Sequence, residues 1–163
     1  MTYAMVGAPT GAYEHRRLAN VCTNQWSVDA GGGYTYFDPR TGREFSAVAG
    51  VTYNFESPDA DYRNGVDAHI DWVASQFFSE SLHAGIVGHF YQQLAGDSGA
   101  GDVLGDSKSR TYAIGPQVGW FLPVGSDKGY VNLRGYWEFA ADHRPEEWNV
   151  WLTVGLPLGG AAH

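Results

Sequence analysis

Residues 44–55 read EFSAVAGVTYNF, with an apolar side chain at every second position. These positions are Phe45, Ala47, Ala49, Val51, Tyr53 and Phe55. Side chains alternate between the two faces of a β-strand, whereas a helix repeats about every 3.6 residues. The stretch therefore predicts a β-strand with one apolar and one polar face.

The same alternation continues on both sides of this stretch. It covers residues 26–36, 66–75, 82–91, 112–120, 131–139 and 148–156, while residues 1–6 are too short for a full strand. Two-faced strands of this length are typical of antiparallel sheets, because strands of a parallel sheet are usually apolar on both faces. The sequence thus predicts an all-β, antiparallel, up-and-down sheet.

The connections between these segments alternate in length. Residues 38–42, 77–81 and 123–128 are short turns, residues 56–64 and 94–108 are longer, and residues 141–146 are intermediate. Short turns at one rim and longer loops at the other are typical of transmembrane β-barrels of the outer membrane. We therefore expect one barrel domain over residues 1–163, with about eight strands that form part of a larger barrel.

Composition excludes several other classes of protein. The net charge is −8 and the few basic residues are scattered, which argues against a nucleic-acid partner. No apolar run approaches the ~20 residues of a membrane-spanning helix, and the first residues do not resemble a signal peptide. The single cysteine, Cys22, excludes an internal disulfide and a multi-cysteine zinc site. We expect the chain to be N-terminally truncated.

Alternation alone does not decide which face points inward. A soluble lipocalin-like barrel directs its apolar face toward a ligand, and a membrane barrel directs it toward lipid. The polar face here is rich in Gly, Ser, Thr, Asn and Gln, and large aromatic residues of the apolar face gather near the segment ends. This distribution predicts contact with outer-membrane lipid, and the lipocalin-like ligand-binding barrel is the alternative.

Polar and charged residues of the opposite face are then candidates to line a lumen. They are Asp29, Glu44, Asp67, His69, Asp71, His83, His89, Gln117, Asn132, Arg134 and Glu138. Arg134 and Glu138 lie four residues apart on one strand face and could pair, since ionisable groups at membrane depth usually face a cavity and pair. Carboxylates outnumber basic groups in this set, which predicts that an open pore prefers cations.

Metal and catalytic sites have little support in the sequence. His69, His83 and His89 share the polar face but have no metal-ligand spacing, so we predict no metal and no cofactor. Residues 95–108 carry acidic groups but lack the order of an EF-hand and its final Glu, and calcium binding there is left open. No Ser/His/Asp arrangement is legible, so no enzyme is predicted. A small outer-membrane barrel enzyme acting on lipid is a further alternative.

Several stretches resemble one family of outer-membrane barrels. They are APTG (8–11), RLAN (17–20), TYFDP (35–39), TG (41–42), NFESPD (54–59), DYR (61–63), YQQLAGDSGAG (91–101), GPQVG (115–119), YWEF (136–139) and RPE (144–146). From about Ala8 onward the chain looks like the C-terminal part of the meta-pathway phenol-degradation family, also described as SphA-like transporters.

The resemblance implies an outer-membrane location and the passage of aromatic or other hydrophobic small molecules. It brings no catalytic residues to this chain. Members of the family begin with a signal peptide and further strands, which the quoted stretches do not cover. The permeant, the direction of transport, the strand number of the full barrel and the oligomeric state are left open by the sequence.

Overall fold

The computed structural model contains eight β-strands and describes residues 1–14, 24–57, 59, 61–99, 108–142 and 145–157. The strands are β1 (Thr2–Gly7), β2 (Ser27–Asp38), β3 (Arg43–Asn54), β4 (Asp67–Phe77), β5 (Leu82–Gln93), β6 (Arg110–Val124), β7 (Asp127–Asp142) and β8 (Trp148–Gly155). Their positions confirm the strands expected from the period-two pattern. Residues 1–6, predicted to be too short for a full strand, contribute most of the six-residue β1.

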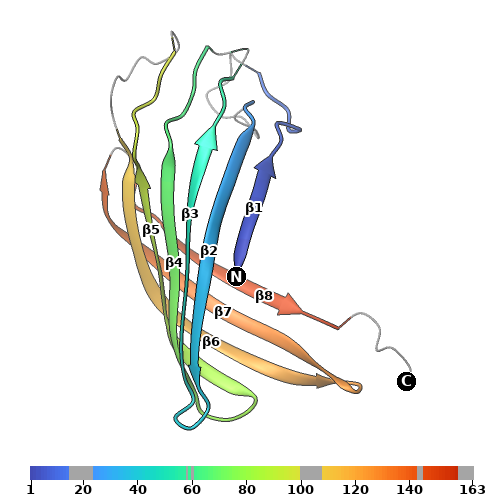
Figure 1. Cartoon of the computed structure of the whole chain (residues 1–163). Helices are drawn as coiled ribbons and strands as arrows, with labels where there is room; N and C mark the ends of the chain where they lie inside the picture. Colours follow the sequence, from blue (N-terminus) through green and yellow to red (C-terminus); the bar gives the residue numbers. More distant parts are fainter. Residues whose placement is uncertain (15–23, 58, 60, 100–107, 143–144, 158–163) are drawn as a thin grey trace.

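All eight strands belong to one antiparallel sheet in the order β1-β2-β3-β4-β5-β6-β7-β8. The fold class is therefore all-β and up-and-down, as predicted. The sheet curls into a half-barrel, and β7 and β8 cross over the open side of the strands that precede them (Figure 1). Within the described residues β1 pairs only with β2 and β8 only with β7, so each of the two end strands has an open edge.

The short and long connections gather at opposite ends of the sheet (Figure 1). In the turn between β2 and β3, the Asp38 carboxylate accepts hydrogen bonds from the Arg40 backbone N–H at 2.9 Å and the Thr41 hydroxyl at 2.8 Å. Gly42 closes this turn with a φ of 67°, a left-handed conformation that glycine adopts without steric cost. The alternation predicted from loop lengths thus corresponds to a short-turn end and a long-loop end.

Two of the long loops are joined to each other at the long-loop end. Arg63, between β3 and β4, forms a β-bridge with Ser98, between β5 and β6. Asp97 accepts hydrogen bonds from the Tyr62 hydroxyl, from the Gly65 backbone N–H at 3.0 Å and from the Gln93 side-chain amide at 2.5 Å. The Asp97 carboxylate is thus hydrogen-bonded to groups of the protein itself. Calcium binding by residues 95–108 was left open by the sequence, and residues 100–107 of that segment lie outside the described residues.

A β-bulge interrupts the regular pairing of β6 with β7. The register shifts between Arg110 and Tyr112, and on the opposing strand Ala140 has a φ of 51°. A bulge inserts an extra residue and bends the strand that carries it. The irregularity lies near the long-loop end, close to where Glu138 faces the inside of the sheet.

Candidate functional site

The two faces of the curled sheet differ sharply in polarity. On the concave face, Asn132 and Glu138 are 0% and 5% exposed, whereas Trp148 and Leu152 on the convex face are 73% and 66% exposed. A soluble protein buries its large apolar side chains and keeps polar groups at the surface. This half-barrel does the opposite, so its concave face is the candidate site.

All eleven residues predicted to line a lumen lie on this concave face. The strand pairing places them at alternate positions of β2 to β7, with every side chain on the same side of the sheet. They form three groups along the strands: one near the long loops, one in the middle and one near the short turns. Each group has its own contacts.

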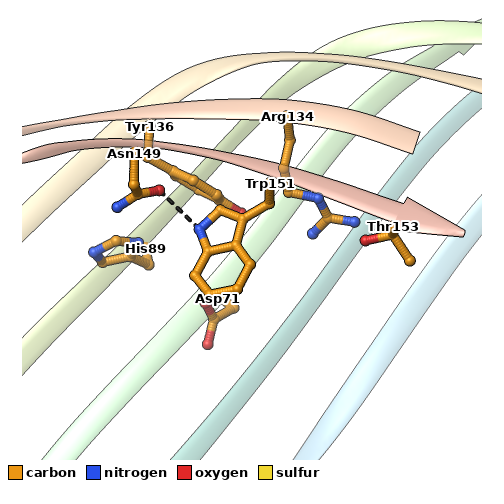
Figure 2. A pocket seen from close by; sticks show the side chains of 7 residues that line it. All are labelled: Asp71, His89, Arg134, Tyr136, Asn149, Trp151 and Thr153. Atoms are coloured by element: carbon orange, nitrogen blue, oxygen red, sulfur yellow. Dashed lines mark hydrogen bonds between the residues drawn. The ribbon is translucent and has the colours of Figure 1, made fainter.

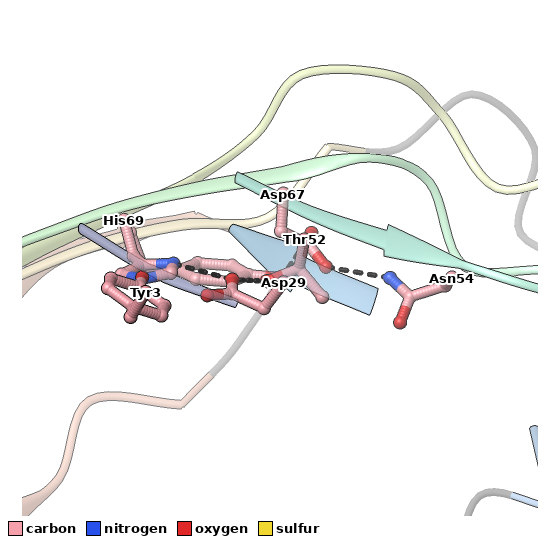
Figure 3. Close-up of polar contacts among 7 residues, drawn as sticks. Tyr3, Asp29, Thr52, Asn54, Asp67 and His69 are labelled. Atoms are coloured by element: carbon pink, nitrogen blue, oxygen red, sulfur yellow. Dashed lines mark hydrogen bonds and ion pairs between the residues drawn. The ribbon is translucent and has the colours of Figure 1, made fainter. Parts of the chain in front are cut away.

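Near the long loops, four strands (β1 to β4) place polar side chains against one another (Figure 3). The Tyr3 hydroxyl and His69 Nε2 are 2.9 Å apart, and His69 Nδ1 lies 3.6 Å from Asp29 Oδ2. Thr52 donates a hydrogen bond of 2.6 Å to the same Asp29 oxygen. A Cβ added at Gly50 would collide with Tyr3 and His69, so this glycine makes room for both rings.

Asp67 lies beside this group and is 9% exposed. Its carboxylate accepts hydrogen bonds from the Asn54 amide at 2.9 Å and from the Tyr91 hydroxyl at 2.6 Å. The Asn54 amide also donates to the Gly65 carbonyl at 2.9 Å, which connects the end of β3 to the following loop. These partners satisfy a buried carboxylate that would otherwise be costly to desolvate.

The middle of the concave face contains a hollow of about 400 Å³ (Figure 2). It is lined by Asp71, His89, Arg134, Tyr136, Asn149, Trp151 and Thr153. His89 Nε2 lies 3.8 Å from Glu138 Oε1, and the Glu147 backbone N–H donates to the other Glu138 oxygen at 3.3 Å. Glu138 therefore lies beside His89 on the concave face, whereas spacing along the strand suggested Arg134 as its partner.

Arg134 instead ends a chain of hydrogen bonds across the strands. Its Nε donates to Asn132 Oδ1 at 2.9 Å, the Asn132 amide donates to Gln117 Oε1 at 3.4 Å, and the Gln117 amide donates to the Ser75 hydroxyl at 2.7 Å. Because Asn132 is completely buried, this chain of hydrogen bonds anchors the Nε side of the Arg134 guanidinium to the sheet.

Toward the short turns a second hollow of about 570 Å³ follows. Its lining combines aromatic rings with a few polar groups: Thr35, Phe37, Glu44, Ser46, Val73, Phe77, His83, Gln117, Phe121, Tyr130 and Arg134. His83 is 4% exposed and its Nε2 lies 3.1 Å from the Tyr130 hydroxyl. Arg134 borders both hollows.

The three histidines considered as metal ligands have separate partners. His69 contacts Tyr3 and Asp29, whereas His83 and His89 contact residues of other strands. Among the residues that the structure describes, no group of three or more His, Cys, Asp or Glu side chains could hold a metal ion.

Sequence analysis missed several residues of the concave face. Tyr3 lies in a segment predicted to be too short for a full strand, and Phe37, Phe121 and Tyr130 each lie one residue outside the predicted segments 26–36, 112–120 and 131–139. The alternation of side chains along each strand is the sequence pattern that could have identified Phe37, Phe121 and Tyr130. Phe37 continues the odd-numbered face that contains Asp29, and Tyr130 shares its parity with Asn132 and Arg134.

The fold and the polarity of its faces define an antiparallel β half-barrel with a polar concave side. The sequence model of the family described as "Putative MetA-pathway of phenol degradation" matches residues 1–154. The chain belongs to this family, as the resemblance predicted. The match includes residues 1–7, which that resemblance left out.

Two further comparisons bear on the chain. Neither the curated proteins nor the solved structures contain a match to it. Across the described residues, no helix has the length and apolar character needed to cross a membrane.

Proposed function

We propose that the protein is part of an outer-membrane β-barrel channel through which aromatic or other hydrophobic small molecules pass. The observation that carries the proposal is the inverted polarity of the sheet. Trp137, Trp148 and Leu152 expose more than 60% of their surface on the convex face. A bilayer removes such side chains from water, and burial of apolar surface is worth about 25 cal/mol per Å².

The polar concave side supports the same interpretation. Its carboxylates lie on the concave side of the sheet, opposite the convex face. Asp29, Asp67 and Glu138 are each less than 10% exposed. In a membrane barrel the interior is polar and the outward band is apolar. A lipocalin-like barrel has the reverse arrangement, so the concave face offers poor support for that alternative.

Family membership supports the choice of permeant. The description of the family names a pathway of phenol degradation, and molecules in such a pathway are aromatic. The hollow near the short turns has aromatic rings in its wall that would contact such molecules. Closure of the channel requires further strand pairing between the open edges of β1 and β8, because unpaired backbone groups are costly in lipid.

Partitioning and uptake together test this function. In a phase-separating detergent, the protein should enter the detergent-rich phase, and in a Gram-negative host with few porins it should fractionate with the outer membrane. Cells that carry it should take up a labelled aromatic compound faster than cells with the empty vector. Recovery in the aqueous phase without detergent would contradict the membrane assignment, and unchanged uptake would contradict the channel.

A further inference from the structure

Five rings form a continuous row at the short-turn end of the concave face. They are Phe37 (β2), Phe77 (β4), His83 (β5), Phe121 (β6) and Tyr130 (β7). Neighbouring ring centroids lie 5.4 Å apart for Phe37 and Phe77, 4.8 Å for Phe77 and His83, and 4.9 Å for Phe121 and Tyr130. Rings at these separations attract one another through dispersion and their quadrupoles. The row is therefore a preformed aromatic surface.

A glycine makes this surface possible. A Cβ added at Gly119 on β6 would collide with the His83 ring, so His83 lies directly over the backbone of the neighbouring strand. The ring is nearly parallel to that of Tyr130, with an interplanar angle of 5° and centroids 5.9 Å apart. His83 and Tyr130, stacked in this way, both line the 570 Å³ hollow.

Arg134 provides the cationic group of this hollow. Its Nε is engaged with Asn132, while among the described residues its two terminal nitrogens have no hydrogen-bond or ion-pair partner. Figure 2 shows the Arg134 side chain extending from β7 into the space on the concave side of the sheet. A guanidinium held at one nitrogen and open at the other two presents a fixed pair of donors, which is the geometry that binds a carboxylate.

Glu44 lines the same hollow from β3, and its carboxylate accepts a hydrogen bond of 2.9 Å from Ser46. It repels a second negative charge, so an anionic ligand is expected to carry a single carboxylate directed toward Arg134. A hollow of this volume is within the usual range for small-molecule sites, which is about 300–1,000 Å³.

We infer that the hollow between the aromatic row and Arg134 binds a monocyclic aromatic monocarboxylate, with its ring on Tyr130 and Phe121 and its carboxylate on Arg134. The inference rests on the proposed function and specifies one class of ligand for a binding site within that channel. Acidic groups elsewhere on the concave face, such as Asp71, disfavour an anion away from Arg134. Binding of an anion on the concave face is therefore confined to the surroundings of Arg134.

The test measures binding of 4-fluorobenzoate to the full chain in detergent micelles by fluorine NMR, and a probe without fluorine is measured by its displacement of bound fluorobenzoate. Three probes separate the contributions to binding: cyclohexanecarboxylate keeps the charge without the aromatic ring, 4-fluorobenzyl alcohol keeps the ring without the charge, and 4-fluorobenzylamine reverses the charge. The fluorobenzoate should bind at least about tenfold more tightly than the alcohol and the amine, since one charge-assisted contact accounts for roughly that factor. It should also bind more tightly than cyclohexanecarboxylate, which keeps the carboxylate but lacks the ring that stacks on Tyr130 and Phe121. Equal binding of the alcohol would overturn the inference.

Variants locate the site. Arg134→Gln should weaken fluorobenzoate binding about tenfold. Arg134→Lys should weaken it by less, because lysine keeps the positive charge but lacks the paired N–H donors of the guanidinium. Arg110→Gln is the matched control, since Arg110 lies near the long loops and pairs with Asp142 at 3.9 Å. Phe121→Leu should weaken fluorobenzoate more than cyclohexanecarboxylate. Unchanged binding in Arg134→Gln would overturn the assignment.

The outcomes distinguish this site from the proposed channel. Binding is measured in micelles and does not depend on transport. Specific binding without any uptake by cells would contradict the channel and leave the site standing, whereas uptake without selective binding would contradict the site alone.

Discussion

Trp148 and Trp151 lie three residues apart on β8 and face opposite sides of the sheet. Trp148 packs on the convex side beside Pro116 and Val150, whereas Trp151 lines the concave hollow with Asp71 (Figure 2). Both indoles are largely exposed in the isolated chain, at 73% and 60%. The two residues therefore report separately on the two faces.

Lipid contact should distinguish these two tryptophans. In variants that keep a single tryptophan, with the others changed to Phe, brominated lipid in proteoliposomes should quench Trp148 fluorescence strongly and Trp151 fluorescence weakly. Acrylamide, which enters water-filled space, should show the reverse order. Quenching of Trp151 by the lipid to the same extent as Trp148 would reverse the assignment of the faces.

Charge substitutions on neighbouring positions of β8 should have unequal costs. Leu152→Arg on the convex face should destabilise the protein in lipid by about 2–4 kcal/mol near the midplane. Thr153→Arg, on the concave face, should cost much less because its side chain reaches the hollow. Denaturant unfolding in lipid vesicles gives both values, and similar losses at the two positions would contradict a lipid-facing Leu152.

The contact between Gly119 and His83 should make a small substitution expensive. Gly119→Ala places a methyl group against a ring held between Phe77 and Tyr130, and overpacking of this kind costs about 1–3 kcal/mol. Gly135→Ala is the control, because a Cβ there meets no atom closer than 3.8 Å.

A double-mutant cycle assigns that cost to the His83 ring. If the contact is responsible, Gly119→Ala should be less destabilising in a His83→Ala background than in the parent protein. Strictly additive losses would place the strain elsewhere.

The strand pattern could be predicted from the sequence because the period of two is a local property of each segment. It placed Asp71, His89 and Arg134 on one face correctly. The contacts between such residues depend on register and on curling, which are set by the whole sheet. Strand pairing puts Glu138 beside His89, and no spacing within β7 reveals this.

Ion selectivity should follow from the carboxylates of the concave face. In planar bilayers an open channel should prefer cations, and Asp71→Asn should reduce that preference because Asp71 lines the central hollow. Asp127→Asn, in the turn region between β6 and β7, is the control and should have a smaller effect. Anion selectivity in the parent protein would contradict the assignment of the acidic face to the pore.

The open edges of β1 and β8 should be visible in amide exchange. Strands β3 to β6 have a partner on both sides, so their amides should exchange slowly in detergent. The outward N–H groups of β1 and β8 have no strand partner among the described residues and should exchange fast, at alternate positions of each strand. In hydrocarbon such groups cost several kcal/mol each, so the isolated chain should close poorly and should lack the heat-dependent gel mobility of a closed barrel. Slow exchange along both end strands in a monomer with heat-dependent mobility would instead show that the eight strands close on themselves.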